Sequence, residues 1–176
     1  MRKNKLAATF VLAATLLAGC NPTYNWRDNS SPDAPYRVMF PAKPASHTRS
    51  IDLNGSKVEM TMTAAEVEGV MFAVGTGVAG DAAGAQAAVD AMKTAMLRNI
   101  DATVQRESAS ARSSGGDQES ARKRIDIDAT GSGKNGPMKL SGRFESRGKR
   151  FYQVIVLGKT VPAEQSEQFM KSFSLL

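Results

Sequence analysis

The chain has 176 residues, a formal net charge of +6 and a hydrophobic fraction of 41%. This length is sufficient for one domain with a real hydrophobic core. The single cysteine, Cys20, excludes an internal disulfide bond, and the single histidine, His47, leaves no basis for a zinc site of the histidine and cysteine type.

The first 19 residues have the order of a secretory signal peptide. Arg2, Lys3 and Lys5 form a positively charged start, and residues 6–18 form a run of low polarity without a charge. The run is shorter than the roughly 20 residues that a membrane-spanning helix needs. We therefore predict that residues 1–19 are a cleaved signal peptide. Its removal takes away the charges of Arg2, Lys3 and Lys5, so the formal net charge of +6 falls to +3.

The run ends in Leu17, Ala18, Gly19 and Cys20, a sequence that resembles the lipobox of bacterial lipoproteins. In that motif the cysteine thiol is diacylated, the signal peptide is cut before the cysteine, and the new amine is usually acylated. The resemblance implies that signal peptidase recognises the three residues before Cys20 and that Cys20 is the lipidation site. Asn21, in place of the aspartate that marks retention in the inner membrane, favours the outer membrane. Two or three acyl chains would hold the protein permanently in membrane lipid.

Residues 20–35 are predicted to form a lipidated N-terminus and a flexible tether. The segment NPTYNWRDNSSPDAP is rich in asparagine, serine, aspartate and proline, a composition typical of a linker. Its large apolar residues are Tyr24 and Trp26. Two alternatives remain for these rings: they lie at the bilayer interface, where amphipathic rings are favoured, or they pack on the domain or lie exposed.

Four β-strands are predicted in the first half of the domain, over residues 36–40, 48–53, 57–67 and 70–74. The strand at 57–67 alternates strictly between apolar and polar residues, as a half-buried strand does. Asn54-Gly55 is a strong hairpin dipeptide, because both residues tolerate positive φ. The short turns between successive strands predict an antiparallel meander.

Residues 81–100 are predicted to form a helix, with Asp81 as its N-cap. Apolar residues recur in this segment at helical spacing, three or four positions apart. They are Ala85, Ala88, Val89, Met92, Met96 and Ile100. The methionines of this stripe are either an adaptable binding surface or one face of a core helix, and the second alternative is favoured.

The second half of the domain begins with a weak polar segment at 102–111, which is predicted to be an edge strand. Three strands with a clearer apolar pattern follow, at 120–129, 138–145 and 151–157. The last of them is apolar on both faces. It is therefore predicted to be a central strand that is covered on both sides.

A second helix is predicted from Thr160 or Val161, with Pro162 at the favoured first helical position. Its buried stripe consists of Phe169, Met170 and Phe173. These elements together predict a single α+β domain over residues 36–176. The domain is expected to contain an antiparallel sheet of about six to seven strands with helices packed on its faces.

Five segments of this domain form a recognisable set. They are Tyr36-Arg37-Val38-Met39-Phe40-Pro41 with Lys43-Pro44, the hairpin with Gly55, the predicted helix at 81–100, Arg150-Phe151-Tyr152-Gln153-Val154-Ile155-Val156, and Phe169-Met170-Lys171-Ser172-Phe173. The set resembles a family of bacterial exported proteins that start with F-x-V-x-F-P-x-x-P and finish with an aromatic strand and F-x-x-S-F. The resemblance covers about residues 36–176 and implies a PsbP-like fold, an antiparallel sheet sandwiched between helices. It carries over no catalytic residue, because the family pattern contains none.

Positive charge is concentrated between residues 122 and 159, where ten basic and three acidic residues lie. Eight of the basic residues fall on three consecutive predicted strands and their turns: Arg122, Lys123, Arg124, Lys139, Arg143, Arg147, Lys149 and Arg150. Within the first strand, Lys123 shares the side of Ile125, whereas its two arginine neighbours take the other side. This candidate patch would bind anionic lipid headgroups, lipopolysaccharide phosphates or an acidic envelope protein. The alternative is that the charges line solvated strands and protect sheet edges.

Residues 75–80 match the G-x-G-x-x-G pattern of dinucleotide-binding loops, and Asp101 lies about 20 residues beyond them. The strand before the pattern belongs to the antiparallel meander, and the segment after the helix is polar. A Rossmann sheet needs a parallel βαβ unit and a buried strand at these places. We therefore expect a flexible strand-to-helix loop at 75–80 and no cofactor.

No catalytic or metal-binding constellation is recognisable in the sequence. Asp126 and Asp128 lie two positions apart on one strand face without a third predicted ligand, as acidic residues on a solvated strand do. The hydroxyl nucleophiles lack a convincing base, and no G-x-S-x-G elbow is present. Nucleic acid is not an expected partner, because the signal peptide removes the protein from the cytoplasm and aromatic residues are few.

These observations predict a membrane-anchored lipoprotein, in the outer membrane rather than the inner one, with its domain in the periplasm or at the cell surface. The expected role is that of a non-enzymatic binding or scaffolding module of the cell envelope. One alternative is a carrier of a small apolar or lipid ligand, held between the helix at 81–100 and the sheet. A second alternative is an envelope hydrolase of unknown type.

Overall fold

The computed structural model describes residues 23–31, 34–53, 55–112, 121–134 and 136–176. The predicted signal peptide and the lipobox with Cys20 lie outside the described residues.

The described chain forms two antiparallel sheets and two helices, so the predicted α+β class is confirmed. The large sheet has seven strands in the order β3-β4-β5-β9-β8-β7-β6, and the small one has three in the order β1-β2-β10. The strands of the large sheet are β3 (Ala45–Leu53), β4 (Ser56–Val67), β5 (Val70–Val78), β6 (Thr103–Arg112), β7 (Arg122–Gly133), β8 (Gly136–Arg147) and β9 (Arg150–Gly158). The remaining elements are β1 (Arg27–Ser30), β2 (Tyr36–Phe40), β10 (Ser174–Leu175), α1 (Ala82–Asn99) and α2 (Ala163–Ser172).

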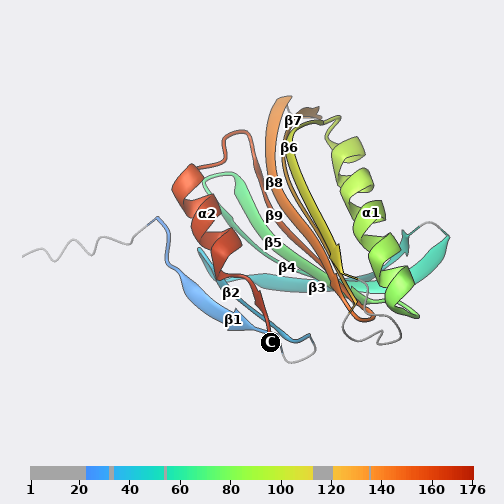
Figure 1. Cartoon of the computed structure of the whole chain (residues 1–176). Helices are drawn as coiled ribbons and strands as arrows, with labels where there is room; N and C mark the ends of the chain where they lie inside the picture. The colour runs from blue at the N-terminus through green and yellow to red at the C-terminus, as the bar shows by residue number, and fades with distance from the viewer. Residues whose placement is uncertain (1–22, 32–33, 54, 113–120, 135) are drawn as a thin grey trace, which may run out of the picture.

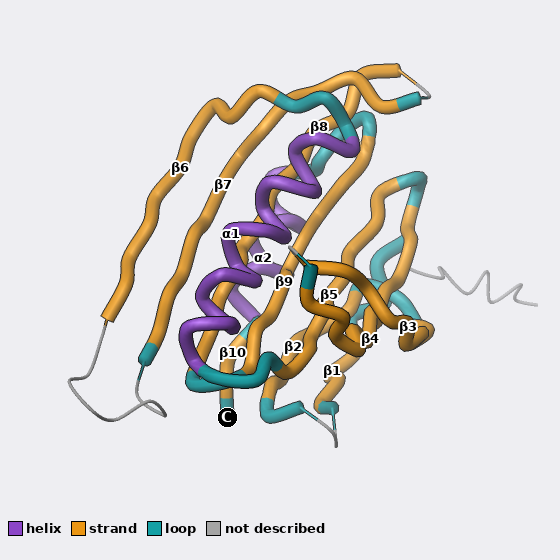
Figure 2. The backbone as a smooth tube through the Cα atoms, turned by 90° about the vertical axis from the view of Figure 1, so that its right-hand side faces the viewer, coloured by secondary structure: helices purple, strands orange, loops and turns teal. Residues whose placement is uncertain are grey.

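The large sheet lies in the middle of the molecule and carries a hydrophobic core on each face. Helix α1 covers one face, and α2 with the small sheet covers the other (Figure 1). Figure 2 looks onto α1, which runs in nearly the same direction as β6 and β7, with α2 behind the sheet. Strand β9 lies between β5 and β8 and is buried along most of its length, as its apolar sequence predicts.

Helix α1 begins and packs as its sequence predicts. The Asp81 side chain accepts a hydrogen bond from the backbone N–H of Gly84 at 2.7 Å, which confirms the predicted N-cap. Met92 is buried against the sheet and Met96 packs at the edge of the same core, so the core interpretation of the methionine stripe is confirmed. Helix α2 begins one residue later than its proline predicts, because Pro162 has extended backbone angles and is itself the N-cap.

The prediction of a flexible tether over residues 20–35 is wrong for the described part of that segment. Strand β1 pairs with β2 along its whole length, and the backbone N–H of Asn25 donates to the carbonyl of Pro41 at 2.7 Å. The rings of Tyr24 and Trp26 lie 6.4 and 6.3 Å from the ring of Phe72. Polar side chains are tolerated in β1 because most of them face solvent, while the backbone of the strand is paired. The two rings therefore pack on the domain, which starts well before Tyr36.

The predicted loop at residues 75–80 is also wrong in its first half, because Gly75 and Gly77 lie inside β5. A Cβ atom on Gly75 would stand 2.2 Å from Cε of Met60, and one on Gly77 would stand 2.4 Å from Cζ of Phe151. These glycines make room for core side chains. Since β5 pairs antiparallel with both of its neighbours, the pattern has no parallel βαβ unit around it.

Gly131→Ala is expected to destabilise the fold by about 1–3 kcal/mol, because a Cβ there would stand 2.2 Å from the backbone oxygen of Ile100. The end of α1 would have to move to accommodate it. Gly80→Ala is the matched control, because its Cβ would meet nothing within 4 Å, and it should change stability by less than about 0.5 kcal/mol. Urea unfolding followed by circular dichroism measures both variants. Equal stability of the two would contradict the close approach of α1 to β7.

Candidate functional site

The large sheet separates the eight residues of the predicted basic patch. Ile125 and Ile127 of β7 pack under α1, so Arg122 and Arg124 point to the opposite face, the side of α2. Lys123 lies on the α1 side and forms an ion pair with Asp90 of α1. By the same alternation Lys139, Arg143, Arg147 and Arg150 lie on the α2 side, and Lys149 lies in the turn between β8 and β9. The structure thus places Lys123 apart from the other residues of the patch.

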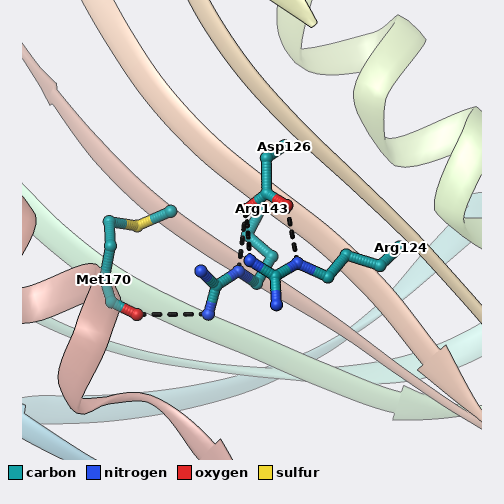
Figure 3. A network of polar contacts seen from close by, with 4 residues as sticks. All are labelled: Arg124, Asp126, Arg143 and Met170. Carbon is teal, nitrogen blue, oxygen red and sulfur yellow. Dashed lines mark hydrogen bonds and ion pairs between the residues drawn. The ribbon is translucent and has the colours of Figure 1, made fainter. Parts of the chain in front are cut away.

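Two of the predicted patch arginines are already held by one carboxylate (Figure 3). Arg124 donates to Asp126 at 2.6 Å through Nε, and Arg143 donates to the second oxygen of Asp126 at 2.8 Å. Arg143 also donates through Nη1 to the backbone oxygen of Met170 in α2 at 3.1 Å, and its side chain is only 12% exposed. Arg143 therefore links α2 to the sheet and is a structural residue.

Two carboxyl groups near these arginines have shifted pKa values, in opposite directions. Burial acts to raise the pKa of Asp126, but hydrogen bonds from Arg124 and Arg143, together with their charges, outweigh it and hold the pKa below its ordinary value of 3.8. Half-buried Glu145 has a pKa above its ordinary value, because burial, with the charge of Asp126, outweighs the opposing charges of Arg124, Arg143 and Arg122. The arginines thus hold Asp126 ionised at neutral pH more strongly than Glu145.

Asp126→Asn is expected to lower stability at pH 7 by about 1–3 kcal/mol, because Arg143 and Arg124 lose their charged partner. The lowered pKa of Asp126 stabilises the fold fully above its ordinary value, and this stabilisation is lost as the pH falls through the lowered pKa. The variant should therefore lose less stability than the wild type on acidification below about pH 4. Urea unfolding at several pH values measures this difference.

Asp128→Asn serves as the control on the same face of β7, because its partner Arg106 is highly exposed and such surface pairs contribute about 0–1 kcal/mol. If the two variants have the same stability and the same acid profile, the structural role of Asp126 is contradicted.

A second set of basic residues forms a row across four neighbouring strands. Arg112 of β6 lies opposite Arg122 of β7, Arg122 lies opposite Arg147 of β8, and Arg147 lies opposite Arg150 of β9. We call these four residues the arginine row. With neighbouring strands 4.7–4.9 Å apart, the row spans about 14 Å. Like charges placed directly opposite each other destabilise a sheet. The repulsion between the four arginines therefore lowers the stability of the fold.

The arginine row differs from the rest of this face in its charge balance. Further along the same strands, Arg106 pairs with Asp128, and Asp126 pairs with two arginines. Among the described residues, no aspartate or glutamate side chain forms an ion pair with a member of the row. Arg147 donates one hydrogen bond, through Nη1, to the backbone oxygen of Leu176 at 3.0 Å.

Arg112 was not among the predicted site residues, because the edge strand was predicted to end at residue 111. Strand β6 continues to Arg112 and pairs with β7 up to that residue. A prediction of one further residue in that strand would have placed Arg112 opposite Arg122.

A polar groove of about 640 Å³ lies on the same face, between α2 and strands β6 to β8. Charged residues of both signs line it: Arg106, Asp126, Asp128, Arg143 and Glu167. The groove thus has no excess of one charge, in contrast to the arginine row. In the part of the chain that the structure describes, no group of three histidine, cysteine or acidic residues is placed to hold a metal ion.

The interface between α1 and the sheet is filled by side chains. Ala85 and Val89 of α1 and Phe144, Phe151 and Ile155 of the sheet are all completely buried there. Neither α1 nor α2 is both long and apolar enough to cross a membrane, and these are the helices of the described residues.

In comparisons with known proteins, no family model and no curated protein matches this chain. The residues and their geometry therefore carry the functional interpretation.

Proposed function

We propose that this chain is a bacterial lipoprotein anchored in a membrane, the outer one in a two-membrane cell, through acyl chains on Cys20. Leu17, Ala18 and Gly19 are then the recognition residues for signal peptidase. Its domain acts as a non-enzymatic binding or scaffolding module of the cell envelope. The lipobox carries the proposal for the anchor, and the arginine row carries the proposal for binding.

We further propose that the domain belongs to the PsbP-like architecture. A seven-stranded antiparallel sheet with a helix on each face is what the resemblance implies and supports this assignment. Among the described residues, buried side chains pack the interface beneath α1, which favours the binding module over the carrier. Asp126 is occupied by two arginines, which gives the hydrolase alternative little support.

The ordered segment from Tyr24 onwards keeps the domain close to the membrane. Cys20 and Tyr24 are four residues apart, and an extended chain of that length reaches about 14 Å. A lipid anchor on Cys20 would therefore hold the domain beside the bilayer. The partner of the arginine row is then a component of the envelope near that bilayer.

Arg147→Glu with Arg150→Glu is expected to abolish envelope crosslinks made through the row, because both charges are reversed while Arg143 and its contacts stay intact. Crosslinking in intact cells, followed by mass spectrometry of the captured species, measures this loss. Lys43→Glu with Arg49→Glu is the control, since it makes the same charge change on exposed residues away from the row. Unchanged crosslinks in a folded row variant would contradict a binding role for the row.

A further inference from the structure

The arginine row continues onto an exposed apolar residue. Val78 of β5 lies directly opposite Arg150, so the row extends across a fifth strand. Val78 and Leu176 are 49% and 63% exposed, and they are the large hydrophobic side chains that remain exposed among the described residues. Both line one groove of about 460 Å³, together with Arg147, Lys149 and Arg150. Basic and apolar side chains therefore share one groove at this end of the sheet.

An adjoining groove of about 500 Å³ shares Val78 and Arg150 with the first. Lys57 and Glu59 also line this second groove, so charges of both signs lie in it and the purely basic lining belongs to the first groove. Thr76 lines the second groove, one position further along the same face of β5. Its hydroxyl is buried and has no hydrogen-bond partner in the described part of the chain. Buried hydroxyls are ordinarily hydrogen-bonded, so this one is an exception; its oxygen lies beneath the surface of the groove and is not itself a contact for a ligand.

The chemistry of these side chains selects one class of ligand. Guanidinium groups bind phosphate through paired N–H donors, and an anion across the row would relieve the repulsion between its members. The straight row of about 14 Å is suited to more than one anion on a flat surface. Exposed Val78 and Leu176 beside it are suited to hydrocarbon. A phosphate that carries acyl chains meets both requirements in one molecule.

We propose that the arginine row and its groove bind the phosphate groups of anionic membrane lipids, with Val78 and Leu176 against the first methylene groups of the acyl chains. This proposal rests on the proposed function for its location in the cell envelope. It adds the chemical class of the partner, which the proposed function leaves open.

The row would give the anchored domain a second contact with lipid. Tyr24 packs on Phe72, which lies opposite Val156 of β9. Arg150 is six residues from Val156 along β9, about 20 Å at 3.3 Å per residue. The lipid contact at the row is therefore separate from the point where the chain leaves the domain towards Cys20.

Native mass spectrometry of the full mature protein, extracted from its own membrane in detergent, tests the proposal. Phosphatidylglycerol, phosphatidylcholine with the same acyl chains, and inorganic phosphate are added in separate titrations. Each basic residue at an anionic lipid surface contributes roughly a fivefold factor in affinity. Arg147→Gln with Arg150→Gln should weaken the phosphatidylglycerol adduct about 30-fold, whereas Lys43→Gln with Arg49→Gln should leave it unchanged.

Arg150→Gln alone provides a milder variant, because it leaves the hydrogen bond between Arg147 and Leu176 in place. It should weaken the adduct roughly fivefold. The expected result is a phosphatidylglycerol adduct that phosphatidylcholine does not form, that inorganic phosphate does not replace, and that the row variants lose.

Three results would overturn the proposal. Equal adducts with both lipids would mean apolar adhesion, and equal binding of inorganic phosphate would mean a free-anion site. A crosslinked protein that depends on the row, without any lipid adduct, would assign the row to an acidic protein. The covalent mass in the same spectra reports the anchor independently, so an unacylated protein would contradict the proposed function without deciding the lipid adduct.

Discussion

Replacing Cys20 by alanine is expected to leave the entire population as an uncleaved precursor without acyl chains. The thiol of Cys20 is the proposed site of acylation, and cleavage is proposed to occur immediately before it. An immunoblot of fractionated cells measures the change, because precursor and mature protein differ by residues 1–19.

Asn21→Asp is the matched control for this variant. It should remain cleaved and acylated, and it should move towards the inner membrane, because aspartate after the cysteine marks retention there. Normal processing of the Cys20→Ala protein would contradict the lipobox.

Phe72→Ala is expected to destabilise the domain by about 3–5 kcal/mol, because it removes a large buried ring from the core. Phe72 is completely buried, and its ring lies 5.4 Å from that of Phe169 and close to those of Tyr24 and Trp26. Its loss leaves a cavity where the N-terminal segment, the sheet and α2 meet. Urea unfolding measures stability, and Trp26, the single tryptophan, reports the local change by fluorescence.

Val78→Ala is the control for Phe72→Ala, because a half-exposed valine on the same strand should cost less than about 1 kcal/mol. A Phe72→Ala protein with wild-type stability and unchanged tryptophan emission would contradict the packing of residues 24–30 on the domain.

The strands of the meander and helix α1 could be predicted from the sequence because their signals are local. Strand β4 shows strict alternation, and α1 has a capping aspartate followed by apolar residues at helical spacing. Strand β1 has neither signal. It forms through backbone pairing with β2 and through Trp26 on Phe72, a residue far along the chain. Composition alone therefore predicted a tether where the fold continues.

The charge content of the candidate site could be predicted, but its division into paired and unbalanced arginines could not. Asp126 and Arg143 are far apart in sequence and meet because the register of β7 against β8 places them opposite each other. The same register brings Arg122 to Arg147. Register depends on the whole sheet, and a shift of one residue would turn every side chain to the other face. A count of charges along the chain contains none of this information.

The structure also changes which residues are suitable for testing a binding surface. Arg143 belongs to the predicted basic patch, yet its guanidinium binds the backbone of α2 and holds that helix on the sheet. Replacing Arg143 by an acidic residue would break this contact. A loss of partner binding in that variant could then not be separated from a loss of folding. Among the described residues, the side chain of Arg150 forms no ion pair, so it can be replaced without breaking one.

The most direct test of the anchored binding module is the intact covalent mass of the protein extracted from its own membrane. We expect a chain that begins at Cys20 and carries the added mass of two or three acyl chains. A mass equal to the full chain of 176 residues, or to a cleaved chain without acyl groups, would contradict the anchor and with it the proposed place of the protein in the cell.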